Sequence, residues 1–291
     1  MQRRSFLGAI GCIPALALSA SASAAAAAAA QKSTKPASPG RRVGIAFGGG
    51  SLHGMAHVGV LKALTEKGLQ FQFIAGTSAG SIVGVLAAAQ MPYGEIHEVA
   101  RQVEWPGLMA ISWSGSGLLQ HTKLRSLIDA TLGNQRIEQL PIPFGAIATD
   151  IATGERVVLR RGPAGNAVSA SCSIPVMFEP VKIDGRNLVD GGLSEPVPVI
   201  AVREMGADIV IGVDVAFRPA EEGVAGFTGV AFQTMQIMAN ALINEQIPRA
   251  DVAIRMNLHH LIGGKDSHEQ LHVAGYAAAM QAWPKLAQLL K

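Results

Sequence analysis

The pentapeptide GTSAG at residues 76–80 has the residue types and spacing of a serine nucleophile on a sharp turn. It follows an apolar segment, residues 71–75, that predicts a strand, and it precedes a small-residue segment that predicts a helix. Small residues at Gly76 and Gly80 would let the chain turn tightly and place the Ser78 hydroxyl at a helix N-terminus, where the helix dipole favours negative charge. The plain alternative is a glycine-serine turn that serves packing, because three small residues at this spacing recur by chance in a chain with 33 glycines.

A second glycine-rich segment, GGGSLHG at residues 48–54, also lies between a predicted strand and a predicted helix. Its glycines allow close backbone approach and can present successive N–H groups to a ligand. His53 occupies the last glycine position of a G-x-G-x-x-G dinucleotide loop, and the Gly-Lys-Ser/Thr of a P-loop is missing. The other interpretation is an oxyanion hole, whose N–H groups stabilise a tetrahedral intermediate and would suit acyl transfer at Ser78.

A serine nucleophile needs a general base, and the sequence offers two kinds. Late histidines could complete a Ser-His-Asp triad, but no neighbouring feature marks any of them as catalytic. They are His259, His260, His268 and His272. Asp190, directly followed by two glycines after a predicted hairpin strand, lies on a tight loop that could approach Ser78. A partly desolvated carboxylate with a raised pKa can accept the serine proton, although an ordinary Asp-Gly turn explains Asp190 on local chemistry alone.

The segments around these residues alternate between strand and helix, which predicts the fold that must position them. The predicted strands cover residues 43–47, 71–75, 144–149, 155–159, 181–183, 187–189 and 209–213. The predicted helices cover residues 54–67, 78–90, 123–131, 197–205, 230–244 and 268–290. This order is typical of an α/β fold with a largely parallel sheet, and neither an internal repeat nor a second core is evident.

Three motifs occur in a fixed order along the chain. They are GGGSLHGMAHVGVLKAL at 48–64, GTSAG at 76–80 and DGG at 190–192. Together they resemble the patatin-like phospholipase family, and the similarity covers about residues 42–291. It includes the ATD, SASCSIPVMFEPVKIDGRNLVDGG and MGADIVIGVDV segments at 148–150, 169–192 and 205–215.

The resemblance implies a three-layer α/β/α fold with a mostly parallel central sheet, and a Ser-Asp dyad without histidine. Ser78 would be the nucleophile and Asp190 the base, supported by three motif glycines. The supporting glycines are Gly76, Gly80 and Gly191. The oxyanion hole would be formed by the N–H groups of Gly49, Gly50 and Ser51. Family members hydrolyse acyl esters of phospholipids, lysophospholipids or neutral lipids, and no metal or organic cofactor is implied.

Two residues depart from the family loop, which commonly reads G-G-G-x-R-G. Ser51 replaces a glycine and His53 replaces the arginine. The serine is a mild change if its φ angle stays negative. The histidine removes a fixed positive charge, because histidine is mostly neutral at pH 7. We therefore expect simple esters or lysolipids to be preferred over intact phospholipids.

The first thirty residues predict a secretory signal rather than part of the fold. Arg3 and Arg4 precede Ser-Phe-Leu and an uncharged stretch that ends in small residues. Paired arginines followed by Phe-Leu resemble a twin-arginine signal, which predicts export of the folded protein to the periplasm. The weaker alternatives are a transmembrane anchor and a lipid attached to Cys12. Residues 31–42 predict a flexible linker, so the patatin-like domain is expected at residues 43–291.

Composition limits the remaining function classes. With 291 residues and 49% apolar content, the chain can build one large domain, which excludes disordered and collagen-like proteins. The net charge is +3, but residues 43–291 carry −3, so the basic excess belongs to the signal and linker. This leaves no charge-based case for nucleic acid. The expected partners are a lipid or acyl-ester substrate and, peripherally, a membrane surface.

Two further segments carry expectations of their own. Residues 223–244 are uncharged but hold several amide and hydroxyl side chains, which predicts a buried helix rather than a membrane span. Residues 105–121, rich in glycine, serine and tryptophan, predict either a lid at the lipid site or an ordinary surface loop.

Cys172 is the one cysteine left after signal cleavage, so no internal disulfide is expected. Two functional alternatives stay open, an α/β-hydrolase-type esterase with a Ser-His-Asp triad and a catalytically silent lipid- or partner-binding scaffold.

Overall fold

A computed structural model describes residues 40–103, 122–218, 224–261 and 266–291. Residues 41–291 form one compact unit. The predicted signal, most of the predicted linker and the 105–121 segment lie outside the described residues.

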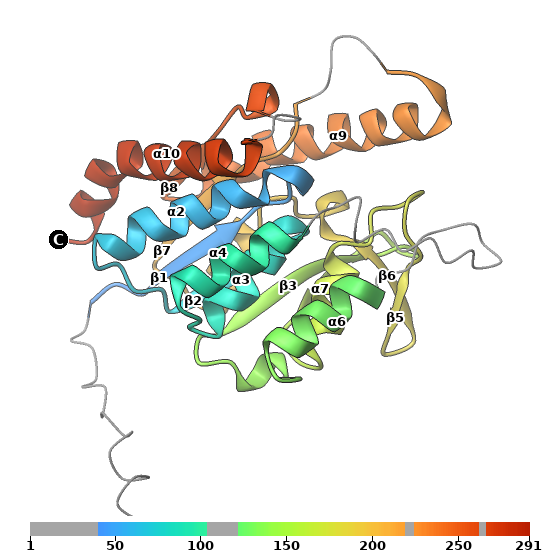
Figure 1. Ribbon diagram of the computed structural model, residues 1–291, viewed down its shortest axis with the longest axis horizontal. Helices are drawn as coiled ribbons and strands as arrows, with labels where there is room; N and C mark the ends of the chain where they lie inside the picture. Colours follow the sequence, from blue (N-terminus) through green and yellow to red (C-terminus); the bar gives the residue numbers. More distant parts are fainter. Residues whose placement is uncertain (1–39, 104–121, 219–223, 262–265) are drawn as a thin grey trace, which may run out of the picture. The chain divides into compact units, whose positions relative to one another are not determined.

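Within the described residues, eight strands form one mixed sheet (Figure 1). The strands are β1 (Val43–Phe47), β2 (Phe73–Thr77), β3 (Phe144–Asp150), β4 (Arg156–Leu159), β5 (Val181–Ile183), β6 (Arg186–Asp190), β7 (Ile209–Asp214) and β8 (Val252–Arg255). The order is β5-β6-β3-β2-β1-β7-β8, and β4 pairs with β3. Strands β3, β2, β1, β7 and β8 are parallel, whereas β4 and β6 run antiparallel to β3. The predicted α/β class with a mostly parallel sheet is therefore confirmed.

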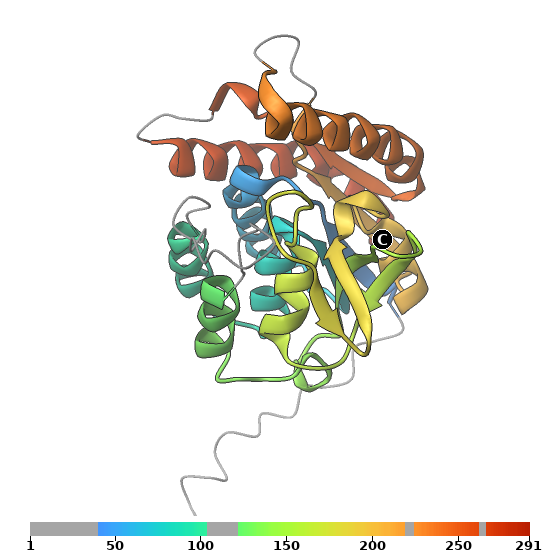
Figure 2. The ribbon, with the colours of Figure 1, turned by 90° about the vertical axis from the view of Figure 1, so that its right-hand side faces the viewer.

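Helices cover both faces of this sheet and make a three-layer α/β/α arrangement (Figures 1 and 2). They are α2 (Gly54–Glu66), α3 (Ala79–Ala88), α4 (Tyr93–Gln102), α6 (Thr122–Thr131), α7 (Ala164–Ser171), α8 (Val199–Met205), α9 (Gly226–Gln246) and α10 (Ser267–Leu289). Strand β1 shows why there are two layers of helices, because successive side chains of a strand point to opposite faces. Ile45 and Phe47 join the larger core with α2, α3, α4, α6, α7 and α10, while Ala46 joins a smaller core with α8 and the end of α9.

Two α-helices and one strand of the described residues were not predicted from the sequence. Helix α7 consists largely of alanine, serine, glycine and asparagine, so it lacks the apolar stripe that marks an amphipathic helix. Helix α4 buries only Ile96 and Ala100, and β8 is four residues long with alternating buried and exposed positions. Strand β2 also begins at Phe73, two residues later than predicted, and it runs to Thr77 immediately before the candidate nucleophile.

Helix α9 is present, but the prediction that it would be buried is wrong. Only Ile243 and Gln246 of this helix are buried, whereas Phe227 is 78% exposed. Val230, Ile237 and Met238 are also exposed, each by more than half. The apolar and polar residues of α9 are mixed around the helix without a distinct apolar stripe, so its composition could not indicate which side faces the core. Within the described residues, no helix is long and apolar enough to cross a membrane.

Helices α2 and α10 lie side by side and pack closely through two glycines (Figure 1). A β-carbon at Gly275 would lie 1.9 Å from the Ala56 carbonyl oxygen, and one at Gly59 would lie 2.0 Å from that of His272. Since β-carbons do not approach carbonyl oxygens this closely, larger residues at these positions would push the helices apart. The C-terminal helix is thereby held against the helix that directly follows the glycine-rich loop.

Candidate active site

Ser78 lies on a strained turn between β2 and α3. Its φ and ψ angles are 52° and −125°, which a non-glycine residue rarely adopts. The neighbouring glycines make the turn sterically feasible: a β-carbon at Gly76 would lie 2.3 Å from the Gly80 carbonyl oxygen, and one at Gly80 would lie 2.2 Å from that of Phe47. This conformation is the strand–turn–helix context that the GTSAG motif predicts.

Two serines that sequence reasoning missed hold this turn. The Ser78 N–H donates to the Ser171 hydroxyl oxygen over 2.9 Å, and the Ser81 hydroxyl donates to the Ser78 carbonyl over 2.7 Å. Ser171 comes from α7, 93 residues away in the chain. No local signal in the sequence marks it, because its role depends on α7 packing beside α3.

Strand register brings Asp190 next to the turn. Thr77 of β2 pairs with Ile147 of β3, and the next β3 residue, Ala148, pairs with Asp190 at the end of β6. Asp190 is 7% exposed, and its Oδ1 accepts a hydrogen bond from the Gly192 N–H over 2.7 Å. The parallel pairing of β2 with β3 and the antiparallel pairing of β3 with β6 thus place the carboxylate at the same edge of the sheet as the serine hydroxyl that follows β2.

Burial dominates the electrostatics of Asp190. Desolvation raises the pKa of its carboxyl from 3.8 to about 6, while hydrogen bonds from the Gly192 N–H and the Ser78 side chain act in the opposite direction. A carboxylate with this pKa is ionised at pH 7 but binds a proton more readily than an exposed aspartate. It has the properties expected of a general base for a serine hydroxyl.

Ser78 and Asp190 line one cavity together with Gly49, Gly50 and Ser51 of the glycine-rich loop. The remaining wall is mostly apolar. It is made by Ile174, Pro175, Leu193, Pro196, Ala216, Phe217, Phe232, Met235 and Ala239, with Gly192, Gln236 and Asn240. Among the described residues, no lysine, arginine or histidine side chain belongs to this wall. The cavity therefore suits an uncharged, apolar group beside the Ser78 hydroxyl.

The glycine-rich loop is fixed by contacts with two other segments. The Gly48 N–H donates to the Val213 carbonyl over 2.9 Å, and the Gly49 N–H donates to the Pro196 carbonyl over 2.8 Å. The Gly49 donor is thus already engaged in this structure. Ser51 has φ 44°, so the sequence-based condition that its φ would stay negative is not met. This left-handed backbone explains why a glycine at this position would be favourable.

His53 and His57 lie beneath the loop rather than in the cavity wall. The buried His53 ring has Nδ1 2.6 Å from the Val215 carbonyl oxygen and stacks on Phe217, with 4.1 Å between ring centroids. His57 of α2, which sequence reasoning missed, has Nε2 2.7 Å from the Gly48 carbonyl oxygen. Burial lowers the pKa of His57 to about 4, so the ring is neutral at pH 7 and its Nε2–H donates to Gly48. The available signal was a histidine inside an otherwise apolar stretch of helix.

The late histidines lie elsewhere, as far as their side chains are described. The His272 Nε2 is 2.6 Å from the Tyr93 hydroxyl, and His260 is exposed. His268 lines a different cavity, which shares Ser51 with the first. None of these three belongs to the wall that contains Ser78. Cys172 is buried, and burial raises the pKa of its thiol well above the usual range, so it is an inert core residue rather than a nucleophile.

The fold and this arrangement define a three-layer α/β/α protein with a serine at a nucleophile turn. The sequence pattern of the patatin-like phospholipases matches residues 45–203, so the chain belongs to the patatin-like phospholipase family. An uncharacterized NTE family protein of Mycobacterium tuberculosis is 38% identical over 218 residues, which cover 72% of this chain and 59% of that protein. Lysophospholipase NTE1 of Coccidioides immitis is 33% identical over 185 residues, which cover 60% of this chain and 12% of that protein.

Among solved structures, VipD from Legionella pneumophila has a similar fold, with a TM-score of 0.56 over 85% of this chain and 67% of VipD. The sequence identity is 14%, so this likeness concerns the fold alone. The match to the mycobacterial protein spans 59% of its length.

Proposed function

We propose that the protein is a serine acyl hydrolase of lipid esters that uses Ser78 as nucleophile and Asp190 as base. The observation that carries this proposal is the shared cavity: a serine on a strained turn and a buried aspartate with a pKa of about 6 face the same apolar space. Membership of the patatin-like phospholipase family supports an ester of a lipid as the substrate class.

In the proposed mechanism, Asp190 accepts the Ser78 proton while Oγ attacks the ester carbonyl carbon. The resulting oxyanion takes hydrogen bonds from the N–H groups of Gly50 and Ser51, because the Gly49 N–H is held by the Pro196 carbonyl. Asp190 then gives its proton to the departing alcohol oxygen, which leaves an acyl-serine. A water loses its proton to Asp190 and attacks the acyl group, and that proton returns to Ser78 as the fatty acid departs.

The cavity wall supports the part of the expected preference that concerns simple esters over phospholipids, and the lipid panel described below tests the part that concerns lysolipids. A phosphate group is best held by arginine or lysine, and the described part of the wall contains neither. His53, which stands where the family loop commonly has arginine, is buried against Phe217 and contacts a backbone carbonyl. It is therefore not placed to bind a headgroup phosphate.

We also propose that α9 makes the peripheral membrane contact. One side of this helix, with Phe232 and Met235, lines the cavity that contains Ser78. Phe227, Ile237 and Met238 of the same helix are exposed, and residues 224–244 carry no charge. Exposed apolar side chains beside a lipid site would lower their free energy by entering the acyl region of a bilayer.

Export to the periplasm through the predicted twin-arginine signal is part of the same proposal, with lipidation of Cys12 as the alternative. Signal cleavage would remove residues 1–30 and leave the linker before the hydrolase domain. Mass spectrometry of protein recovered from the periplasmic and membrane fractions distinguishes a cleaved N-terminus from a chain that keeps Cys12 with an acyl mass.

The decisive experiment is labelling by a fluorophosphonate probe followed by a lipid panel. Wild-type protein is expected to be labelled once per chain at Ser78, whereas Ser78→Ala is expected to fold normally and to be neither labelled nor active. The panel compares a short-chain ester, a lysophospholipid and a diacyl phospholipid. Esterase activity at the wild-type level in Ser78→Ala would overturn the assignment, and absence of labelling in folded wild type would favour a silent scaffold. Loss of activity on replacing one late histidine would favour a Ser-His-Asp triad.

A further inference from the structure

The segment between Asp190 and α8 contacts each part of the proposed site through its backbone. The Glu195 carbonyl accepts a hydrogen bond from the Thr77 hydroxyl over 2.8 Å, and Thr77 directly precedes the nucleophile. The next carbonyl, that of Pro196, accepts from the Gly49 N–H over 2.8 Å. Two consecutive carbonyl groups therefore anchor the nucleophile turn and the glycine-rich loop to the segment that begins with the base.

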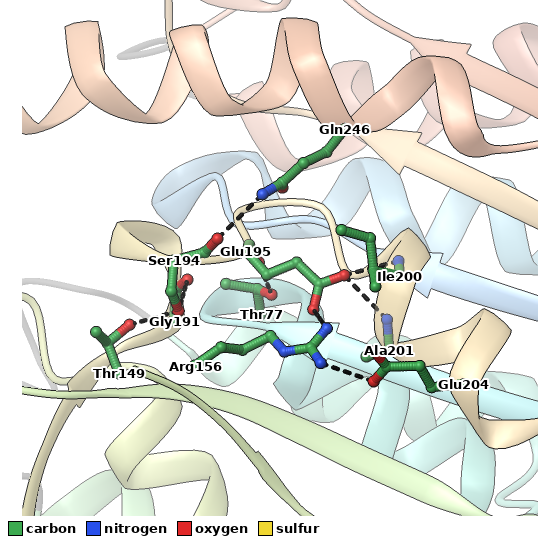
Figure 3. Close-up of polar contacts among 10 residues, drawn as sticks. All are labelled: Thr77, Thr149, Arg156, Gly191, Ser194, Glu195, Ile200, Ala201, Glu204 and Gln246. Atoms are coloured by element: carbon green, nitrogen blue, oxygen red, sulfur yellow. Dashed lines mark hydrogen bonds and ion pairs between the residues drawn. The ribbon is translucent and has the colours of Figure 1, made fainter. Parts of the chain in front are cut away.

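The Glu195 side chain is the internal support of this segment, and it is completely buried (Figure 3). Its Oε1 accepts hydrogen bonds from the backbone N–H groups of Ile200 and Ala201, over 2.7 and 3.0 Å, in the first turn of α8. Its Oε2 accepts from Arg156 Nη1 over 2.9 Å. A buried carboxylate is costly unless its oxygens are hydrogen-bonded and its charge is paired, and both conditions are met here.

Arg156 ties this support to the sheet that carries the base. It lies on β4, and β4 pairs with β3, on which the Thr149 hydroxyl donates to the Asp190 carbonyl over 3.0 Å. The Thr149 hydroxyl is also 2.8 Å from that of Ser194, the residue before Glu195 (Figure 3). The other Arg156 nitrogen, Nη2, contacts Glu204 Oε2 over 2.7 Å. The Arg156 and Glu204 side chains are 26% and 55% exposed.

We propose that Glu195 is a positioning residue for the hydrolase. Its carboxylate, held by Arg156 and the first turn of α8, fixes the carbonyl groups of residues 195 and 196. These carbonyls set the distance between the nucleophile turn, the oxyanion loop and the Asp190 loop. This inference rests on the proposed function, since it takes Ser78 and Asp190 in the roles given above. Glu195 itself touches none of the reacting atoms and lies outside the cavity wall described.

The substitution Glu195→Gln tests the proposal with little change in shape. The amide oxygen can still accept from α8, but the amide nitrogen then faces Arg156 Nη1, so a donor opposes a donor. We expect kcat on a soluble short-chain ester to fall about 10- to 100-fold, with KM changed less than about 2-fold, because a displacement of about 1 Å has this order of effect on a reaction between fixed groups. The rate constant for fluorophosphonate labelling of Ser78 should fall by a similar factor, while the final labelled fraction stays at the wild-type level.

Three matched variants separate positioning from a general loss of stability. Glu204→Gln removes the negative charge beside the same guanidinium on its exposed side and should leave kcat and the labelling rate unchanged. Arg156→Lys keeps a cation for Glu195 and should retain more of the labelling rate than Arg156→Met, which removes it. Thermal unfolding is recorded for every variant, since a residue that only stabilises the fold would lower the melting temperature without lowering kcat per labelled site.

The outcomes are distinguishable. A folded Glu195→Gln protein with wild-type kcat and labelling rate would overturn the positioning role. If Glu195→Gln does not fold, folded Arg156→Met decides the matter, and a wild-type labelling rate in that variant would overturn the role equally. Wild-type and Ser78→Ala proteins are labelled in parallel with the variants. If wild type is not labelled in a Ser78-dependent way, the proposed function fails rather than the role of Glu195.

Discussion

Replacement of Asp190 by asparagine should abolish activity and yet stabilise the protein at neutral and alkaline pH. The Asp190 carboxyl is 7% exposed, and burial raises its pKa from 3.8 to about 6. Asparagine has nearly the same shape as the neutral acid, and its amide oxygen can accept the hydrogen bond from the Gly192 N–H. The substitution therefore removes the buried charge without opening a cavity.

The expected magnitude follows from the same pKa values. A difference between 3.8 and about 6 corresponds to about 3 kcal/mol, at about 1.4 kcal/mol for each pKa unit. The folded protein holds a proton on Asp190 between about pH 4 and 6, where the unfolded chain has lost it. The contribution of Asp190 to stability therefore falls as the pH rises through this window and stays low above about pH 6. At pH 8, Asp190→Asn should gain up to about 3 kcal/mol, or about 6–12 °C in melting temperature for a domain of this size.

The assay is thermal unfolding of wild type and Asp190→Asn at pH 4 and pH 8, with Asp184→Asn as control. Asp184 is an exposed aspartate on the turn between β5 and β6, so its replacement removes one carboxylate without removing a buried charge. The stabilisation by Asp190→Asn should be present at pH 8 and nearly absent at pH 4, whereas the effect of Asp184→Asn should not change with pH in this way. In parallel, the wild-type kcat/KM should rise with pH and reach half its maximum near pH 6.

Either of two results would refute this reasoning. An Asp190→Asn protein that is no more stable than wild type at pH 8 would mean that the buried carboxylate carries no desolvation cost. A wild-type kcat/KM that does not change between pH 5 and pH 8 would mean that the group with a pKa near 6 is not the base.

Four further predictions concern the glycine-rich loop, the His57 side chain that contacts this loop, the exposed helix α9 and the contact between α2 and α10. Ser51→Gly should raise the free energy of unfolding by about 1 kcal/mol in urea titration, because it relieves a left-handed serine backbone. His57→Leu should cost about 1–3 kcal/mol and slow labelling of Ser78, since the Gly48 carbonyl loses its donor, whereas His57→Gln should restore part of both. Phe227→Ser combined with Ile237→Ser should weaken sedimentation with phosphatidylcholine vesicles while leaving short-ester hydrolysis unchanged, and equal vesicle binding would exclude α9 as the contact. Gly275→Ala should lower the melting temperature, at a cost of about 1–3 kcal/mol for overpacking, and an unchanged value would contradict the close contact with α2.

The nucleophile turn could be predicted because its determinants are local in sequence. Gly76, Ser78 and Gly80 lie within five residues, between segments whose composition predicts strand and helix. The approach of Asp190 is different, because it depends on β3 lying between β2 and β6 with a particular register. Local chemistry could not distinguish Asp190 from an ordinary turn residue, and the family resemblance supplied the pairing.

The supporting residues escaped prediction because their partners are remote backbone groups. Thr77 meets the Glu195 carbonyl across 118 positions, and Ser171 meets the Ser78 N–H across 93. A buried glutamate has no sequence signature either, since glutamate is usually a surface residue. The prediction that α9 would be buried failed for another reason, since a helix without a distinct apolar stripe does not indicate which side is covered.

The close contact between α2 and α10 has a consequence for the order in which the site can form during synthesis. The glycine-rich loop leads directly into α2, but α2 is covered by a helix that is made more than two hundred residues later. In a nascent chain that still lacks α10, the apolar residues of α2 that would face α10 are exposed to water. The glycine-rich loop that precedes α2 then lacks a stably packed helix to hold it. The proposed hydrolytic activity is therefore expected only after α10 has left the ribosome, so a nascent chain that still lacks α10 is expected to be inactive toward lipids.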